Sequence, residues 1–427
     1  MSADTLVIRP CGPLHGTVTV NGAKNAVLPI MAACLLTAER SVIENVPHVT
    51  DVLTMIEILR GLGVAVEFAG DRLTVAPGRY TGTVAAYDLV SRMRASVCVL
   101  GPLLARHGRA QVSMPGGCVI GPRPIDLHLK GLQALGASFT IEHGYVVGTT
   151  QALRGGRVYL SGAFGSSVLA TGNVMMAATL APGTTVIEHA ACEPEVVDLA
   201  NFLSAMGACI EGQGSPVIRV EGVPRLRGVR YRIIPDRIEA GTLMIAAAIV
   251  GGDLAIDGAL AEHLGAVIDK LSEAGAQVEK RNGSIRVQAN HPLRSVEVTT
   301  LPFPGFPTDL QAQMMALMAV SRGVSVLTEK VYPERFMHIS ELNRMGASIT
   351  REGSSAIVKG VSRLSGAPVT ASDLRASAAL MLAGMAAENQ TELRGLEHLD
   401  RGYQDLEAKL VRLGASIERV SSLPATG

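Results

Sequence analysis

MGASITR, residues 345–351, is one of six similar phrases spaced along this chain of 427 residues. The other copies are LGVAVEF (62–68), LGASFTI (135–141), MGACIEG (206–212), AGAQVEK (274–280) and LGASIER (413–419). An apolar residue followed by glycine is typical of the end of an amphipathic helix, and the alternating apolar positions beyond it predict a short strand. The glycines recur at intervals of about 70 residues, and this spacing predicts six similar units.

A second kind of segment recurs in step with the first and is apolar nearly all round. The six copies are NAVLPIMAACLL (25–36), RASVCVLGPLLA (94–105), SVLATGNVMMAATL (167–180), EAGTLMIAAAIV (239–250), DLQAQMMALMAV (309–320) and DLRASAALMLAGMAA (373–387). A helix that is apolar on every side is buried. Each unit therefore predicts one buried helix, one amphipathic helix and strands between them, in an α/β (α+β) fold with its helices inside its sheets.

Six units exceed one compact domain, so we expect three in each of two domains. The first domain spans 22–233, and the second takes 1–21 together with 234–427. The first strand, LVIRPCGPLHGTVTV (6–20), then returns to close the sheet of the second domain. The alternative is two ordinary α/β domains in which the glycine spacing is incidental.

Composition and charge exclude several classes of protein. The formal net charge is +0, from 38 basic and 38 acidic residues, which argues against binding to nucleic acid. The longest apolar runs fall short of the ~20 residues that cross a bilayer, so membrane insertion is not expected. Six cysteines without a CxxC pair, and an N-terminus without a signal peptide, predict a reduced, cytoplasmic protein. Ten histidines form no HxxxH pattern, so no metal site is expected.

Polar and charged residues stand where the apolar helices begin. They are Lys24 with Asn25, Arg94, Ser167, Arg237 with Glu239, Asp309, and Asp373 with Arg375. The first turn of a helix presents unpaired N–H groups that favour anions. If these helix starts share a direction, they face one cleft together with Arg123 and Arg401, and the expected ligand is a phosphate or a phosphate with a carboxylate. The alternative is that these charges cap helices and extend to solvent.

Asp309 lies in LPFPGFPTDLQAQM, where prolines and a glycine fix the approach to the helix. One interpretation is that Thr308 or Asp309 caps the helix, which is a common role for both residue types. The other is that the Asp309 carboxylate also faces the cleft and acts as a general base.

Cys118 occupies an unusual place for a cysteine. It lies in MPGGCVIGPRPIDLHL (114–129), where glycines and prolines predict a loop that ends at a helix beginning near Asp126. A cysteine used only for packing usually lies in an apolar run, and Cys118 does not.

Together these motifs resemble the enolpyruvyl transferases, in the branch that acts on UDP-N-acetylglucosamine. The resemblance covers essentially the whole chain through NGAKNAVLPIMAA, YDLVSRMRASVCVLGPLLAR, PGGCVIGPRPIDLHL, EPEVVDLANFL, PDRIEAGT, PGFPTDLQAQM, RFMHISELNRMGA, DLRASAALMLAG and HLDRGYQDLEAKL. It implies two inside-out α/β barrels of three repeats each, with the active site in the cleft between them. It also implies transfer of the enolpyruvyl group of phosphoenolpyruvate to the 3′-hydroxyl of UDP-N-acetylglucosamine, with release of phosphate and without a metal or organic cofactor. This reaction begins peptidoglycan precursor synthesis.

The resemblance also implies a role for each matching residue. Cys118 is expected to be the general acid that protonates C3 of phosphoenolpyruvate and to form a covalent adduct at C2. Asp309 is expected to accept the hydroxyl proton, and Lys24 and Arg401 complete the catalytic set. The other expected substrate contacts are Asn25, Arg94, Arg123, Pro124, Ile125, Asp126, Leu127, Ser167, Val168, Val331, Arg335 and Arg375.

Leu169 departs from the family pattern, which usually has glycine at this position of the nucleotide segment, and it adds bulk beside the expected uridine diphosphate. One alternative is therefore an enzyme of the same fold with another acceptor, either a free nucleotide or shikimate 3-phosphate. Another is a catalytically silent paralogue that binds UDP-sugar as a sensor. A thiol hydrolase that pairs Cys118 with His128 lacks an oxyanion-hole motif.

Overall fold

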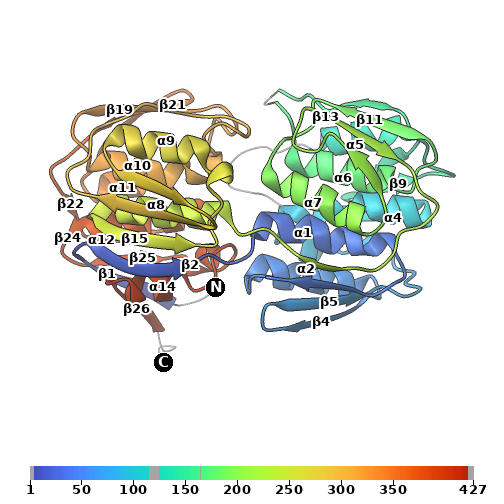
Figure 1. Cartoon of the computed structure of the whole chain (residues 1–427), viewed down its shortest axis with the longest axis horizontal. Helices are drawn as coiled ribbons and strands as arrows, with labels where there is room; N and C mark the ends of the chain where they lie inside the picture. Colours follow the sequence, from blue (N-terminus) through green and yellow to red (C-terminus); the bar gives the residue numbers. More distant parts are fainter. Residues whose placement is uncertain (1–3, 115–124, 164, 422–427) are drawn as a thin grey trace. The chain divides into compact units, whose positions relative to one another are not determined.

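The computed structural model describes residues 4–114, 125–163 and 165–421 (Figure 1). The six glycine phrases are built alike, since Gly63, Gly136, Gly207, Gly275, Gly346 and Gly414 all have positive φ, between 87° and 112°. The helices before them are α2 (Thr50–Gly61), α5 (Asp126–Ala134), α7 (Pro194–Ala205), α9 (Gly265–Ala274), α11 (His338–Arg344) and α14 (Leu406–Arg412). The strands after them are β4 (Ala65–Ala69), β8 (Ser138–Glu142), β12 (Cys209–Glu211), β16 (Gln277–Arg281), β20 (Ser348–Glu352) and β26 (Ser416–Ser421). The predicted helix, glycine and strand are confirmed in every repeat.

The predicted buried helices are also confirmed. They are α1 (Lys24–Ala33), α4 (Leu100–His107), α6 (Val168–Ala178), α8 (Arg237–Val250), α10 (Gln311–Ala319) and α12 (Leu374–Ala386). Two of the predicted segments begin with a 3-10 turn, η2 (Arg94–Val99) before α4 and η4 (Thr308–Leu310) before α10. Nearly every residue of α8, α10 and α12 is buried, and these three helices pack on one another. No helix among the described residues is long and apolar enough to cross a bilayer.

Among the described residues, six four-stranded sheets share one topology, in which a leading strand pairs in parallel with the second strand and the remaining pairs are antiparallel. Three of them are β14-β3-β5-β4, β6-β7-β9-β8 and β10-β11-β13-β12, with β3 (Ser41–Glu44), β5 (Arg72–Ala76), β6 (Val84–Ala85), β7 (Arg109–Ser113), β9 (Tyr145–Thr149), β10 (Arg157–Tyr159), β11 (Thr184–Glu188), β13 (Val217–Glu221) and β14 (Arg230–Arg232). The others are β2-β15-β17-β16, β18-β19-β21-β20 and β23-β25-β1-β26, with β1 (Asp4–Arg9), β2 (Leu14–Thr19), β15 (Gly252–Asp257), β17 (Ser284–Ala289), β18 (Val298–Thr300), β19 (Val324–Glu329), β21 (Ser355–Lys359), β23 (Pro368–Thr370) and β25 (Thr391–Arg394). The sheets stay separate, so hydrogen bonds among the described residues close no barrel.

Short elements complete the chain. They are η1 (Cys34–Leu36), α3 (Tyr87–Val90), η3 (Ala261–His263), α13 (Leu396–Leu399) and the small sheet of β22 (Leu364–Ser365) with β24 (Ala387–Glu388). The described residues fall into two compact units, each with its own apolar core. One holds 22–114, 125–163 and 165–234 and is called the Lys24 unit; the other holds 4–21 and 235–421 and is called the Asp309 unit.

The chain passes from one unit to the other twice, each time directly after the leading strand of a sheet. Strand β2 pairs with β15 within the Asp309 unit, and the chain then continues into α1 of the Lys24 unit. Strand β14 pairs with β3 within the Lys24 unit, and the chain then continues into α8 of the Asp309 unit. Gly22 lies at the first of these passages, where an added Cβ would come within 1.7 Å of the Asn45 carbonyl oxygen.

The stretch predicted as one strand over 6–20 forms two strands, β1 and β2, in different sheets. The sequence Pro10-Cys11-Gly12-Pro13 separates them. Proline has no N–H to donate to a sheet, so two prolines so close together end one ladder before the next begins. The single-strand prediction was therefore wrong.

Candidate active site

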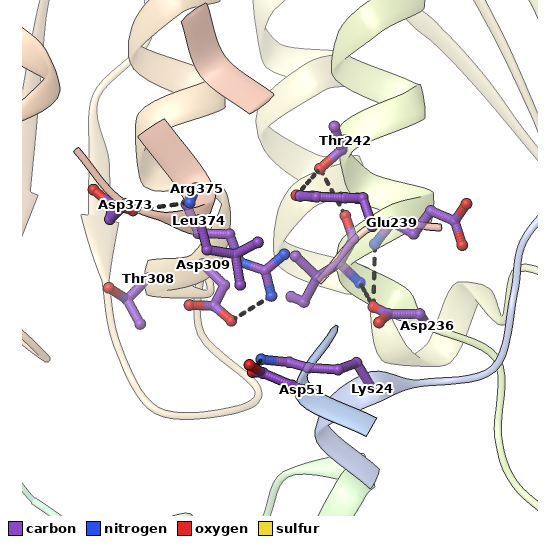
Figure 2. A network of polar contacts seen from close by, with 12 residues as sticks. Lys24, Asp51, Asp236, Glu239, Thr242, Thr308, Asp309, Asp373, Leu374 and Arg375 are labelled. Atoms are coloured by element: carbon purple, nitrogen blue, oxygen red, sulfur yellow. Dashed lines mark hydrogen bonds and ion pairs between the residues drawn. The ribbon is translucent and has the colours of Figure 1, made fainter. Parts of the chain in front are cut away.

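Lys24 is the first residue of α1, and its side chain is buried in the Lys24 unit. Its Nζ lies 2.9 Å from Asp51 Oδ2, and the two residues are only 9% and 2% exposed (Figure 2). Asp51 stands in the first turn of α2, where a carboxylate is favoured by the helix N–H groups. The ammonium of Lys24 is thus held in a fixed place by a buried counterion.

Asp309 lies between two arginines in the Asp309 unit. Its Oδ1 accepts a hydrogen bond from Arg335 Nη1 at 2.8 Å, and its Oδ2 accepts one from Arg375 Nη2 at 2.9 Å (Figure 2 shows the second). Neither Thr308 nor Asp309 caps the helix that follows, because neither η4 nor α10 has a side-chain cap. The capping prediction was wrong, since the guanidinium groups take up the carboxylate instead.

The two arginines set the charge of Asp309. Burial alone raises the pKa of a carboxyl group, but Arg375 and Arg335 together outweigh it and hold the pKa of Asp309 well below its usual range. In this arrangement the carboxylate is charged and is a weak base. An anionic ligand that draws the two guanidinium groups to itself raises the basicity of Asp309, so the trio can couple anion binding to proton transfer.

Arg375 is oriented by its surroundings. Asp373 caps α12, because its Oδ1 accepts from the backbone N–H groups of Arg375 and Ala376 at 2.8 and 3.1 Å. The Arg375 guanidinium lies 5.2 Å from the centre of the Tyr403 ring, and the Tyr403 hydroxyl is 2.9 Å from the Thr242 hydroxyl. The buried Nε of Arg375 has no hydrogen-bond partner among the described residues.

The predicted nucleotide segment begins a helix of the Lys24 unit. Ser167 caps α6 by accepting a hydrogen bond from the Ala170 N–H at 3.3 Å, and Val168 is the first residue of that helix. Leu169, the departure from the family pattern, is half-buried and packs against an apolar cluster that includes Ile125 and Val97. Its added bulk is therefore taken up at least in part by apolar packing.

The helix that was predicted near Asp126 is α5, which begins at that residue. Asp126 is exposed, whereas Ile125 and Leu127 are buried. The buried His128 follows them, and burial together with the positive charge of Arg94 lowers its pKa to about 3. Its neutral ring is held by Asn173, whose Nδ2 lies 3.0 Å from His128 Nδ1.

The Asn173 amide fixes the tautomer of His128. Asn173 Oδ1 accepts from the Gly101 N–H at 2.7 Å, so its Nδ2 must be the group that donates to Nδ1 of the imidazole. The proton of His128 therefore resides on Nε2.

The remaining predicted residues are distributed as follows. Asn25 and Arg94 are half-buried at the starts of α1 and η2, Val331 is half-buried after β19, and Arg401 is half-buried after α13. Cys118, Arg123 and Pro124 lie outside the described residues. No group of three or more His, Cys, Asp or Glu side chains within 4–114, 125–163 and 165–421 could hold a metal ion.

Several residues of the site were not predicted from the sequence. Asp51 is the counterion of Lys24, and Tyr403 lies beside Arg375. Thr308 accepts a hydrogen bond from Arg335 and donates one to Glu329. Tyr403 belongs to HLDRGYQ and Glu329 ends a strand, but no local pattern marks either one as a partner of an arginine.

Comparison with known proteins places the chain in a family. The family model described as EPSP synthase (3-phosphoshikimate 1-carboxyvinyltransferase) matches residues 8–410. The chain is 52% identical to a protein of Methylacidiphilum infernorum named UDP-N-acetylglucosamine 1-carboxyvinyltransferase, over 98% of this chain and 99% of the relative. It is also 52% identical to UDP-N-acetylglucosamine 1-carboxyvinyltransferase 1 of Caldanaerobacter subterraneus, over 97% and 99% of the two chains.

Solved structures agree in fold. The enolpyruvyl transferase NikO from Streptomyces tendae superimposes with a TM-score of 0.88 at 27% identity, covering 98% of this chain and 99% of NikO. EPSP synthase from Acinetobacter baumannii superimposes with a TM-score of 0.75 at 20% identity, covering 98% and 100%, which supports the fold alone. With buried helices inside six repeated sheets, and with matches that run along nearly its whole length, the chain belongs to the enolpyruvyl transferase family, whose model is described as EPSP synthase.

Proposed function

We propose that this enzyme transfers the enolpyruvyl group of phosphoenolpyruvate to the 3′-hydroxyl of UDP-N-acetylglucosamine and releases phosphate. The observation that carries the proposal is the 52% identity, over nearly the full chain, to relatives named for this acceptor. The buried Lys24 and the Arg335–Asp309–Arg375 trio fit it, because two anionic substrates need fixed cations and the acceptor hydroxyl needs a base. Its cytoplasmic location is part of the proposal and rests on the cysteine pattern.

The first half of the proposed reaction is an addition. Asp309 accepts the proton of the 3′-hydroxyl while the oxygen bonds to C2 of phosphoenolpyruvate, and Cys118 gives a proton to C3. C2 becomes a tetrahedral ketal carbon that still carries the phosphate. Lys24, Arg94 and Arg401 bind the phosphate and carboxylate, and these cations stabilise the charge that builds up.

The second half is an elimination. The Cys118 thiolate takes a proton back from the C3 methyl group, the C2=C3 double bond forms again, and the C2–O bond to phosphate breaks. Phosphate leaves with the electron pair of that bond, and the enol ether of the sugar nucleotide remains. A thiol suits this use because its ordinary pKa, near 8.5, makes both the acid and the thiolate accessible near neutral pH.

We expect phosphate release from phosphoenolpyruvate with UDP-N-acetylglucosamine, and none with shikimate 3-phosphate or free UMP. Lys24→Ala should lower the rate by about a hundredfold or more, because it removes a buried cation from the site. A phosphate assay with each acceptor measures both effects. Lys270→Met, which removes an exposed lysine paired with Glu273, is the matched control and should retain full activity.

The same assay separates the alternatives. Release only with UMP or with shikimate 3-phosphate contradicts the proposed acceptor and makes Leu169 the first residue to change. No release with any acceptor, from a folded protein that binds UDP-N-acetylglucosamine, supports the silent sensor.

Fosfomycin, a small electrophile that mimics phosphoenolpyruvate, should alkylate Cys118. Four of the other cysteines are poorer targets. Burial raises the pKa of Cys34 and Cys98 to about 12 and that of Cys11 to about 11, and burial followed by the charge of Glu193 raises the pKa of Cys192. Intact-mass analysis with peptide mapping should therefore find one adduct, at residue 118.

Cys209 is exposed, so it tests whether fosfomycin modifies any accessible thiol. A general thiol reagent should modify Cys209, while fosfomycin should leave it unmodified. An adduct at Cys209 and none at Cys118 contradicts the role proposed for Cys118.

A further inference from the structure

Glu329 is a fully buried carboxylate at the end of β19, with 0% exposure and no ion pair within the described part of the chain. Its Oε1 accepts from the Thr300 hydroxyl at 2.5 Å and from the backbone N–H groups of Val331 and Tyr332, both at 2.9 Å. Its Oε2 accepts from the Thr308 hydroxyl at 2.9 Å. A buried acid without a cation costs stability, so its four hydrogen bonds need a reason beyond packing.

The direction of these bonds fixes the hydroxyl of Thr308. That hydroxyl has one proton and gives it to Glu329, so only its lone pairs remain for other partners. Arg335 Nη1 donates to those lone pairs at 3.1 Å and also donates to Asp309 Oδ1 at 2.8 Å. The chain of donors therefore runs from Arg335 through Thr308 to Glu329.

We propose that Thr308 and Glu329 are positioning residues that hold the Arg335 guanidinium in place independently of Asp309, and that Glu329 also holds the Val331 backbone. The inference rests on the proposed function, in which Asp309 accepts a proton and thereby loses its charge during each turnover. At that moment Arg335 loses the negative charge of its ion-pair partner. Thr308 keeps the guanidinium where the anionic substrates need it.

Thr308→Val tests the link, because valine keeps the shape of threonine and removes the hydroxyl. We expect kcat/KM for UDP-N-acetylglucosamine to fall by about 10- to 100-fold, the effect of losing a hydrogen bond to a charged group. Thermal stability should fall as well, because the buried Oε2 of Glu329 loses its donor. Thr308→Ser restores the hydroxyl and should restore activity close to wild type. Thr184→Val is the matched control, since Thr184 also donates to a carboxylate, that of Glu221, at 2.8 Å on a sheet of the Lys24 unit.

Glu329→Gln tests the hydrogen-bonded chain from Arg335 through Thr308 at its Glu329 end. Three donors surround Oε1, so the glutamine oxygen will turn toward them and its NH₂ group will face Thr308. That substitution reverses the Thr308 hydrogen bond but keeps the support of the Val331 N–H. Glu329→Gln leaves a lone pair of the Thr308 oxygen for Arg335, so it should lower kcat/KM less than Thr308→Val does. If both residues act through the same hydrogen bond to Arg335, the double variant will be no worse than Thr308→Val alone.

Three outcomes overturn the inference: Thr308→Val with wild-type kcat and KM, Thr308→Ser as impaired as Thr308→Val, or additive losses in the double variant. Crystal structures of the Thr308 variants give a readout that needs no turnover, namely a displaced Arg335 in Thr308→Val and a retained one in Thr308→Ser. Failure of the proposed function is distinguishable, because then the wild-type enzyme itself releases no phosphate with UDP-N-acetylglucosamine while the displacement of Arg335 still decides the inference.

Discussion

Asp309→Asn is expected to lower kcat by about 10²- to 10⁴-fold, the usual contribution of a general base. Asparagine keeps the shape of the carboxylate and still accepts hydrogen bonds, but it cannot take the proton of the acceptor hydroxyl. Because Arg335 and Arg375 hold the pKa of Asp309 well below its usual range, the wild-type carboxylate stays charged through mildly acidic pH. The acid side of the pH–rate profile of the free enzyme should therefore not report Asp309. Steady-state kinetics between pH 5 and 9 measure both effects.

Asp253→Asn is the matched control for this prediction. Asp253 is also held by an arginine, since Arg286 Nε and Nη2 donate to its two oxygens at 2.8 and 2.6 Å, but it lies on the β15–β17 ladder. The control should keep wild-type kcat. Equal activity of Asp309→Asn and wild type contradicts the role of base, and a loss of fold in circular dichroism would assign the effect to the two unpaired arginines instead.

Lys409→Met is expected to reduce the free energy of unfolding by about 3–5 kcal/mol, because it leaves the buried carboxylate of Glu239 without its cation. Lys409 Nζ pairs with Glu239 Oε1 and also donates to the Thr19 carbonyl at 2.9 Å. Glu239 in turn accepts from the Asn21 N–H at 2.7 Å. The pair thus holds the segment that follows β2, and denaturant titration measures its loss.

The loss of stability in Lys409→Met should depend on pH in a definite direction. Burial already raises the pKa of Glu239 despite the nearby Lys409, and removal of Lys409 raises it further. The folded variant then takes up a proton at a higher pH than the unfolded chain does. The loss in free energy of unfolding relative to wild type should be largest at a pH above the pKa of Glu239 in the folded variant. The variant should regain stability as the pH falls toward the ordinary glutamate pKa of about 4.3.

Lys270→Met is the control here too, since the exposed pair of Lys270 with Glu273 should contribute at most about 1 kcal/mol. The double variant Glu239→Gln/Lys409→Met should recover part of the loss because no buried charge remains. A loss in Lys409→Met no larger than that in Lys270→Met contradicts the prediction.

The repeats were predictable because their signals are local. A glycine with positive φ at a helix end and a helix that is apolar on every side each depend on about a dozen neighbouring residues. All six copies of both elements formed as expected. Lys24, Asp309 and Arg375 could be placed at helix starts for the same reason. The support of Lys24 and Arg375 could not be predicted, because Asp51 and Tyr403 reach them from other elements.

Two local predictions failed because nonlocal contacts prevailed. Asp309 was expected to satisfy helix N–H groups, but two guanidinium groups offer a carboxylate stronger, charge-assisted hydrogen bonds. The segment 6–20 was expected to be one strand, but its halves join sheets whose other members lie hundreds of residues away.

The place of β1 has a consequence for the order in which a ribosome delivers this chain. Strand β1 fills the third position of the sheet β23-β25-β1-β26, so it must wait for its partners at Thr391–Arg394 and Ser416–Ser421, which are made much later. The Lys24 unit emerges entirely within that interval and can fold during synthesis. The Asp309 unit can complete its sheets only after β26 has been made, and until then the alternating apolar face of β1 is exposed to chaperones and to other nascent chains.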